Sequence, residues 1–279
     1  MADIKQIKTG DTTYDIWAAK ATADGSGNAI TSTYMTKANP TGTGSLSINR
    51  KASTTIGTNS VAVGNNGTAS GNYSFASGNA TGALGYASFA TGSSATASNT
   101  NAFAEGNTTT ASGYASHAEG YGTLAEGESS HAEGESTVAL GDYSHAEGNG
   151  TSASGAFSHA EGFMCCADGE GAHAEGLFTG ASGDYSHAEG DCTEASGDYS
   201  HAEGNYTIAN GDYQHVSGKY NVTDTTSAVI VGNGTSSSAR SNAHTLDWSG
   251  NAWFAGNITF GGVNLTYDST NKRMIVSVS

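Results

Sequence analysis

One pattern constrains the fold of this chain more than any other: a 14-residue repeat runs without slippage through more than half of its 279 residues. The clearest copy reads Ser144-His145-Ala146-Glu147-Gly148. Twelve consecutive copies fill the histidine position with Val61, Phe75, Phe89, Phe103, His117, His131, His145, His159, His173, His187, His201 and His215. Such strict periodicity indicates a stacked-repeat architecture rather than a flexible linker, although glycine supplies 40 of the residues.

The composition of one repeat favours strands over helices. Fourteen residues are too few for a pair of helices, and the repeat lacks long apolar side chains at helical spacing. Two short strands joined by two tight turns fit, and each coil then rises by one strand spacing of about 4.8 Å. We therefore predict an all-β fold, a parallel β-roll whose coils stack into a rod roughly 55 Å long by the same spacing.

Side-chain alternation along the two strands predicts which residues form the core. In the reference coil, which begins at Ser144, the expected inward residues are Ser144, Ala146 and Gly148 on the first strand, and Thr151, Ala153 and Gly155 on the second. The position of Ala146 is alanine in eleven of twelve repeats, and that of Ala153 is alanine in all eleven complete ones. Only small side chains fit such a thin core, and the glycines would supply the tight turns.

The opposite face of the first strand carries the positions of His145 and Glu147. We call this column the ladder, and its members are Val61, Phe75, Phe89, Phe103, His117, Glu119, His131, Glu133, His145, Glu147, His159, Glu161, His173, Glu175, His187, Glu189, His201, Glu203 and His215. The histidine position accepts Val, Phe and His but never Lys or Ser, which suits a protein interface. Since a single stack of alanine-rich coils buries little apolar area, we expect a closed homo-oligomer to cover the ladder.

The segments that flank the repeat differ from it in composition. Residues 1–39 form a predicted N-terminal attachment region, in which Ile4–Lys8 and Thr12–Trp17 alternate in polarity as the strands of a hairpin do. Residues 40–59 read as a linker and lead-in strand, and 60–218 as the β-roll. Residues 219–279 form a predicted β-rich C-terminal cap or tip, with strands at Ala228–Val231 and Met274–Val278 and hairpin turns within Thr245–Phe260.

Charge and hydropathy exclude several classes of partner. The net charge is −16, so the surface repels phosphate backbones and nucleic-acid binding is not expected. No apolar signal segment opens the chain, and no run of eighteen apolar residues occurs. We therefore expect neither Sec-dependent export nor membrane insertion.

The stacked histidines and glutamates raise the question of metal binding or catalysis. His and Glu are legitimate metal ligands, but no third ligand type recurs within a repeat, and Phe fills the histidine position in earlier copies. Hydrogen bonding between His and Glu, or with a neighbouring subunit, is the favoured interpretation, with a metal or anion on a symmetry axis as the alternative. Since Glu recurs in nearly every coil of the second half, it forms a column rather than a catalytic pair. We expect no catalytic residues, no metal site, no cofactor and no enzymatic activity.

Aromatic residues form a second repeated feature. Tyr143, Tyr185, Tyr199 and Tyr213 share one position of the repeat, which Tyr73 and Phe157 also occupy. Packing of the corner against the next coil or subunit is the favoured interpretation. The alternative is a stripe that contacts glycans, to which Trp248 and Trp253 of the cap would add.

The repeat resembles a known family. Ser60-Val61-Ala62-Val63-Gly64, Ala69-Ser70-Gly71 and Tyr73-Ser74 are similar to the head repeat of YadA-type trimeric autotransporter adhesins, and the likeness covers about residues 60–218. It implies a left-handed parallel β-roll, 14 residues per coil, and a homotrimer in which the ladder forms the interface. The His-Glu copies depart from the Val-Ile form usual in that family, and neither its secretion signal nor its C-terminal membrane barrel is seen in this sequence.

The ends resemble a different group. Asp3–Ile7, Tyr14–Ile16 and Leu246–Gly256 are similar to tail-fibre and prophage structural proteins of gut Firmicutes, in which Ser-His-Ala-Glu-Gly repeats also occur. This resemblance implies a virion structural protein, made in the host cytoplasm and released by lysis. We expect a trimeric fibre or spike that acts as a rigid spacer and host-surface adhesin, joined to phage tail or capsid proteins through its N-terminal region. A cell-surface adhesin head is the alternative, and a glycan-degrading tailspike is a third hypothesis.

Overall fold

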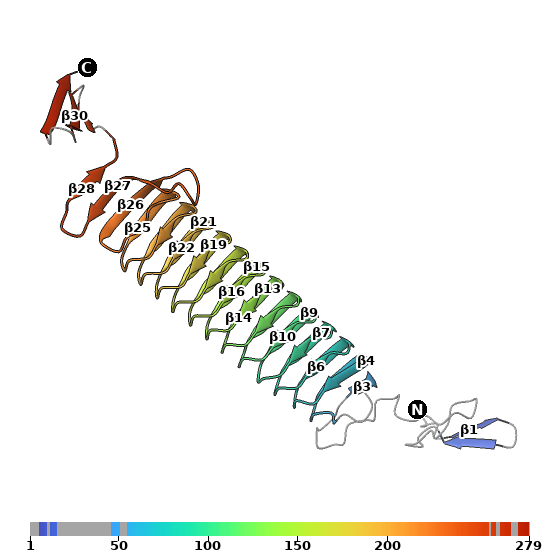
Figure 1. Cartoon of the computed structure of the whole chain (residues 1–279). Helices are drawn as coiled ribbons and strands as arrows, with labels where there is room; N and C mark the ends of the chain where they lie inside the picture. Colours follow the sequence, from blue (N-terminus) through green and yellow to red (C-terminus); the bar gives the residue numbers. More distant parts are fainter. Residues whose placement is uncertain are drawn as a thin grey trace.

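A computed structural model describes residues 6–9, 12–15, 46–50, 55–256, 258–260, 263–268 and 273–278, with side chains for 55–256, Ile258 and Leu265. The described residues form strands and turns but no helix. They accordingly contain no helix long and apolar enough to span a membrane. Most of them belong to one long stack of coils, the rod in Figure 1.

The rod is a parallel β-solenoid of 14-residue coils, which confirms the predicted β-roll repeat. Each coil contributes one longer and one two-residue strand, and β4 (Val61–Ala69) spans both in the first coil. The longer strands are β5 (Phe75–Asn79), β7 (Phe89–Ser93), β9 (Phe103–Asn107), β11 (His117–Tyr121), β13 (His131–Glu135), β15 (His145–Asn149), β17 (His159–Phe163), β19 (His173–Leu177), β21 (His187–Asp191), β23 (His201–Asn205) and β25 (His215–Lys219). The short strands are β6 (Gly82–Ala83), β8 (Thr96–Ala97), β10 (Thr110–Ala111), β12 (Leu124–Ala125), β14 (Val138–Ala139), β16 (Ser152–Ala153), β18 (Cys166–Ala167), β20 (Gly180–Ala181), β22 (Glu194–Ala195) and β24 (Ile208–Ala209).

The core is a column of small side chains between the two parallel sheets. Ala146 and Ala153 are both fully buried, and the same holds at the equivalent alanines of the other coils. Ser144 is buried and its hydroxyl donates to the carbonyl of Gly141 (2.6 Å). Thr151 is buried and its hydroxyl donates to the carbonyl of Glu147 (3.0 Å). The predicted inward positions of alanine, serine and threonine are confirmed. Most of the inward serines donate to a turn carbonyl as Ser144 does, whereas among the inward threonines of the described coils only Thr151 and Thr207 have a hydrogen bond from the hydroxyl.

Glycine has two roles, one of which differs from the prediction. Gly155 is buried as expected, and a Cβ there would lie 1.9 Å from the carbonyl oxygen of Gly169 in the next coil. Gly148 was expected to face inward, but it is exposed and has φ +106°. The positive φ ends the in-and-out alternation of extended backbone, and a Cβ at Gly148 would lie 2.1 Å from the carbonyl oxygen of Gly162 in the next coil.

The parallel stack continues beyond residues 60–218 at both ends. Strand β3 (Leu46–Arg50) pairs in parallel with β4, and β26 (Ser227–Asn233) pairs in parallel with β25. Strands β27 (Asn242–Asp247) and β28 (Ala252–Phe254) then add antiparallel to β26. The expected strand at Ala228–Val231 and the hairpin in Thr245–Phe260 are confirmed.

Two buried amides close the stack at this end. The amide nitrogen of Gln214 donates to the carbonyls of Asp224 and Ser227, both at 2.8 Å. Asn221 accepts from the backbone N–H of Ile208 (2.8 Å) and donates to its carbonyl (3.0 Å), so its side chain replaces a further strand beside β24. In the other coils the position of Gln214 holds serine or alanine, and the position of Asn221 holds mostly threonine. The longer side chains of these two residues therefore act as the cap that a repeat stack needs.

The remaining described strands form two small sheets. Strands β1 (Gln6–Thr9) and β2 (Thr12–Asp15) pair antiparallel, which confirms the N-terminal hairpin over those residues. Strands β29 (Ile258–Phe260), β30 (Val263–Asp268) and β31 (Arg273–Val278) make an antiparallel three-stranded sheet. The expected strand at Met274–Val278 is confirmed within β31.

Candidate functional site: the ladder and the aromatic stripe

The ladder lies on the outer face of the longer strands, as predicted. In-register pairing places His145 between His131 and His159, and the imidazole rings stack. Ring centroids of successive histidines from His117 to His215 are 4.6–4.9 Å apart, with interplanar angles of 2–11°. The strand spacing therefore sets the ring spacing.

Phenylalanine continues the same column toward the N-terminus. Phe75, Phe89 and Phe103 stack at 4.8 and 4.7 Å, with interplanar angles of 10° and 6°. The orientation of the ring planes changes between Phe103 and His117, whose rings meet edge to face at 83°. All three phenylalanines are half-buried in the single chain, so each ring keeps an exposed edge.

The ion-pair contact of each ladder glutamate, within 4.0 Å, is with a histidine of the next coil. The Nε2 atom of His131 lies 3.5 Å from Oε1 of Glu119, and seven such pairs between His131 and His215 span 3.3–3.8 Å. Only the pair of His187 and Glu175, at 3.3 Å, forms a hydrogen bond. Six Nε2 atoms of the ladder are buried without a hydrogen-bond partner, those of His117, His131, His145, His159, His173 and His201.

Two histidines of the ladder have lowered pKa values. Burial lowers the pKa of His159, and the positive charges that its neighbours His173 and His145 would carry lower it further. The pKa of His201 is lowered by the same causes in the same order. A side-chain hydrogen bond with Glu147 raises the pKa of Glu161 above its usual value.

The aromatic stripe follows one corner of the rod, at residues with left-handed backbone. Tyr185, Tyr199 and Tyr213 have φ of 56–57° and stack at 5.2 and 4.9 Å. Tyr143 stacks on Phe157 at 5.2 Å, and Gly171 interrupts the stripe between the two groups. The rings pack on the neighbouring coil, as the favoured interpretation held, and they remain 50–63% exposed.

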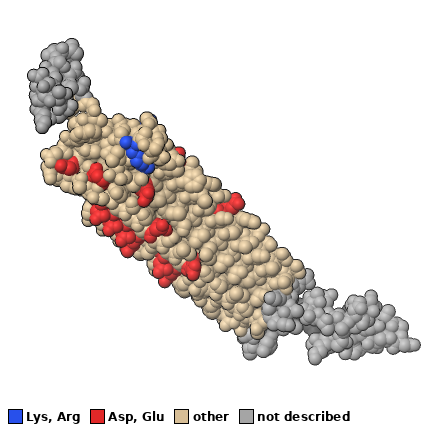
Figure 2. Space-filling view, viewed as in Figure 1, with Lys and Arg blue, Asp and Glu red and all other residues tan. Residues whose placement is uncertain are grey.

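Acidic groups accompany the stripe. One carboxylate oxygen of Asp198 accepts from the backbone N–H of Asp184 (3.0 Å), and one of Asp212 accepts from that of Asp198 (3.2 Å). The hydroxyl of Tyr185 donates to Oε1 of Glu170 (2.6 Å), which together with the negative charge of Glu170 raises the pKa of Tyr185. Figure 2 shows acidic side chains along one side of the rod, where basic ones are scarce.

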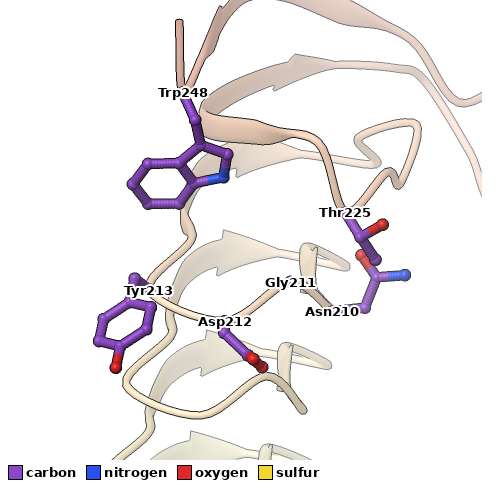
Figure 3. A pocket seen from close by; sticks show the side chains of 6 residues that line it. All are labelled: Asn210, Gly211, Asp212, Tyr213, Thr225 and Trp248. Atoms are coloured by element: carbon purple, nitrogen blue, oxygen red, sulfur yellow. The ribbon is translucent and has the colours of Figure 1, made fainter.

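An open hollow lies where the stripe ends, between the last regular coil and the cap (Figure 3). It measures about 460 Å³ and is lined by Asn210, Gly211, Asp212, Tyr213, Thr225 and Trp248. Tyr213 stacks on Tyr199 with one ring face, and Trp248 projects toward the same side of the molecule as Tyr213 in Figure 3. Of the proposed glycan contacts, the fold thus brings Tyr213 and Trp248 to one hollow, whereas Tyr143 and Trp253 stand apart from it.

A second corner of the rod also carries exposed large side chains, which were not expected from the sequence. Met164, Phe178 and Tyr206 also have left-handed backbone and are 37–50% exposed. They line a second open hollow of about 510 Å³ together with Arg240, which reaches in from beyond β26. Residue type varies freely at this position of the repeat, from Ala80 to Tyr206, so no pattern in the sequence marked it.

No family model matches the chain, and no curated protein matches it.

Proposed function

We propose that this chain is a rigid, homotrimeric fibre or spike segment of a bacteriophage or phage-like particle, serving as a spacer and host-surface adhesin. The observation that carries the proposal is the ladder: an outward column of contacting rings, stacked within its phenylalanine block and within its histidine block, on a solenoid whose own core is mostly alanine.

The ladder favours assembly because the single chain leaves its rings half-exposed. The core of a coil buries little more than two methyl groups, Ala146 and Ala153 in the reference coil. Each buried methyl or methylene contributes only about 0.8 kcal/mol, so a thin stack gains much from burying further apolar surface. A closed three-fold arrangement would bring three ladders together and cover the exposed edges of Phe75, Phe89 and Phe103. The resemblance to YadA-type heads supports three as the number.

The cap end supports the adhesin part of the proposal. Tyr213 and Trp248 are 63% and 56% exposed and lie beside Asp212 in the hollow. Aromatic faces next to carboxylate and amide groups suit glycans, because sugar rings present C–H groups to the aromatic face and hydroxyls to the polar groups. The N-terminal region would then join the particle.

Sedimentation equilibrium of the full chain tests the trimer. We expect a mass three times the 28.0 kDa of one chain. Replacing Phe75, Phe89 and Phe103 together by Asp should shift the mass toward the monomer. The matched control replaces Tyr185, Tyr199 and Tyr213 by Asp, which puts the same charges on the exposed stripe and should leave the trimer intact. A wild-type monomer, or equal effects of the two triple variants, refutes the interface.

Immunogold labelling separates the two particle assignments. Antibody against the purified chain should label phage-like particles released on lysis and leave intact producing cells unlabelled. Label on intact cells and none on released particles would instead assign the chain to a cell-surface adhesin.

A further inference from the structure

We propose that the ladder binds divalent transition-metal ions, Zn²⁺ foremost, between histidine and glutamate side chains of neighbouring coils. The inference goes beyond the proposed function, because every ligand set lies within one chain and needs no partner subunit, and it departs from the sequence-based expectation of no metal site. Five sets of three ligand atoms lie within 4.8 Å of one another: His117, Glu119 and His131; Glu133, His145 and Glu147; Glu147, His159 and Glu161; His173, Glu175 and His187; and Glu189, His201 and Glu203.

The in-register stacking of the coils supplies the third metal ligand that a single repeat lacks. One repeat holds one His and one Glu, too few for a metal site. In-register pairing brings His131 beside His117 and Glu133 beside Glu119, so the third ligand comes from the next coil. Two imidazoles and a carboxylate, or one imidazole and two carboxylates, are donor sets that Zn²⁺ accepts, with water in the remaining position.

The spacing of the facing atoms fits a shared ion better than a hydrogen bond. The Nε2–Oε1 distances of the seven pairs are 3.3–3.8 Å, and only one pair is hydrogen-bonded. Zinc binds His nitrogen and carboxylate oxygen at about 2.0–2.2 Å, so two ligands at a tetrahedral angle lie about 3.4 Å apart. The ladder thus holds its donor atoms near the separation that one ion requires.

Six imidazole nitrogens of the ladder lack a hydrogen-bond partner. The Nε2 atoms of His117, His131, His145, His159, His173 and His201 are buried without a hydrogen bond. A buried polar atom without a partner destabilises the fold, because it has lost its hydrogen bond to water and gained none in return. An ion at each set would satisfy these atoms, and it would also offset the repulsion between neighbouring carboxylates.

Isothermal titration of the metal-free full chain with ZnCl₂ tests the proposal. Glu147 belongs to two of the five sets and no other residue is shared, so four ions can bind at the same time. We therefore expect at least four ions per chain and a higher melting temperature. Titration with Co²⁺ should add the visible absorption of tetrahedral coordination. No binding, or one weak ion per chain, overturns the proposal.

Three variants locate the ions. His131→Phe removes a ligand of the first set only, so one ion should be lost. The ladder should accept the phenylalanine, because Phe103 already stacks on Phe89 in the same column. Phe103→His should add one ion, because the new side chain would face Glu105 and His117 as His117 faces Glu119 and His131. His244→Ala is the matched control, since His244 of β27 belongs to none of the five sets and its ring packs, tilted by 31°, against Phe254 of β28. Circular dichroism verifies that each variant is folded. If the number of bound ions per chain stays unchanged in His131→Phe and Phe103→His, or falls in His244→Ala, the assignment is overturned.

Discussion

Replacing Gly148 by alanine inserts one methyl group where neighbouring coils touch, and it tests the coil geometry directly. Gly148 has φ +106°, and a Cβ there would lie 2.1 Å from the carbonyl oxygen of Gly162 and 3.0 Å from its C and N atoms. Gly180 offers the matched control, because it has no positive φ and a Cβ there meets nothing within 4 Å. Both changes remove a glycine and add the same methyl, so the unfolded chain is affected equally.

The expected effects have opposite signs. At Gly148 the disfavoured φ costs about 1–3 kcal/mol, and overpacking against the next coil costs about 1–3 kcal/mol more. The free energy of unfolding should therefore fall by about 2–6 kcal/mol. Gly180→Ala should instead raise it by about 0.4–1 kcal/mol, because it only restricts the unfolded chain.

Urea unfolding followed by far-UV circular dichroism measures both variants. Because stacked repeats can unfold in sections, amide hydrogen exchange in the coils around residues 134–162 should be followed as well. Faster exchange should be confined to those coils in Gly148→Ala. An unfolding midpoint for Gly148→Ala equal to or above that of Gly180→Ala would refute the close approach of the coils.

Four further predictions concern the core, the cap and the ladder. Ala146→Leu should lower the stability by about 1–3 kcal/mol per site, because the fully buried methyl has no room to grow; an unchanged melting temperature would mean that the side chain points outward. Gln214→Ala leaves the buried carbonyl of Ser227 and the partly buried carbonyl of Asp224 without donors and should cost about 2–4 kcal/mol in urea unfolding, and an unchanged stability would argue against its capping role. His145→Phe should leave the assembly folded and soluble in sedimentation, whereas aggregation of the variant alone would mean that the ladder faces solvent. The pKa values of His159 and His201 are lowered in the folded chain, so their stability contribution is full above the unfolded value near 6.5 and is lost as pH falls below it; melting should occur at lower temperature at pH 5 than at pH 8, and the reverse order would indicate His⁺–Glu⁻ pairing.

The solenoid could be predicted from the sequence because every 14-residue repeat specifies the same coil. A period of 14 residues without insertion forces each residue to pair with its equivalent in the next coil. Alanine at the positions of Ala146 and Ala153 could then only mean a thin core, since any larger side chain would be repeated along the column and would separate the sheets. Local pattern and global architecture carry the same information here.

The site features were harder to predict because they depend on neighbours outside one repeat. His131 faces Glu119 of the preceding coil, although Glu133 lies nearer in sequence. Alternation placed Gly148 inside, but its positive φ ends the alternation of extended backbone. The hollow at Tyr213 and Trp248 forms only where the regular coils stop, so no periodicity marks it.

Stacking in register also limits how the ladder changes along the rod. Each ring contacts only the equivalent residues of two neighbouring coils, so a side chain that stacks well on its own kind is favoured in blocks. Phe75, Phe89 and Phe103 form one block and the histidines from His117 form another, and the single edge-to-face contact between Phe103 and His117 is the junction. A change within a block creates two such junctions, whereas a change at its end only moves one. Phe103→His should therefore disturb stacking less than His145→Phe, and comparing the unfolding midpoints of these two variants measures the energy of a junction directly.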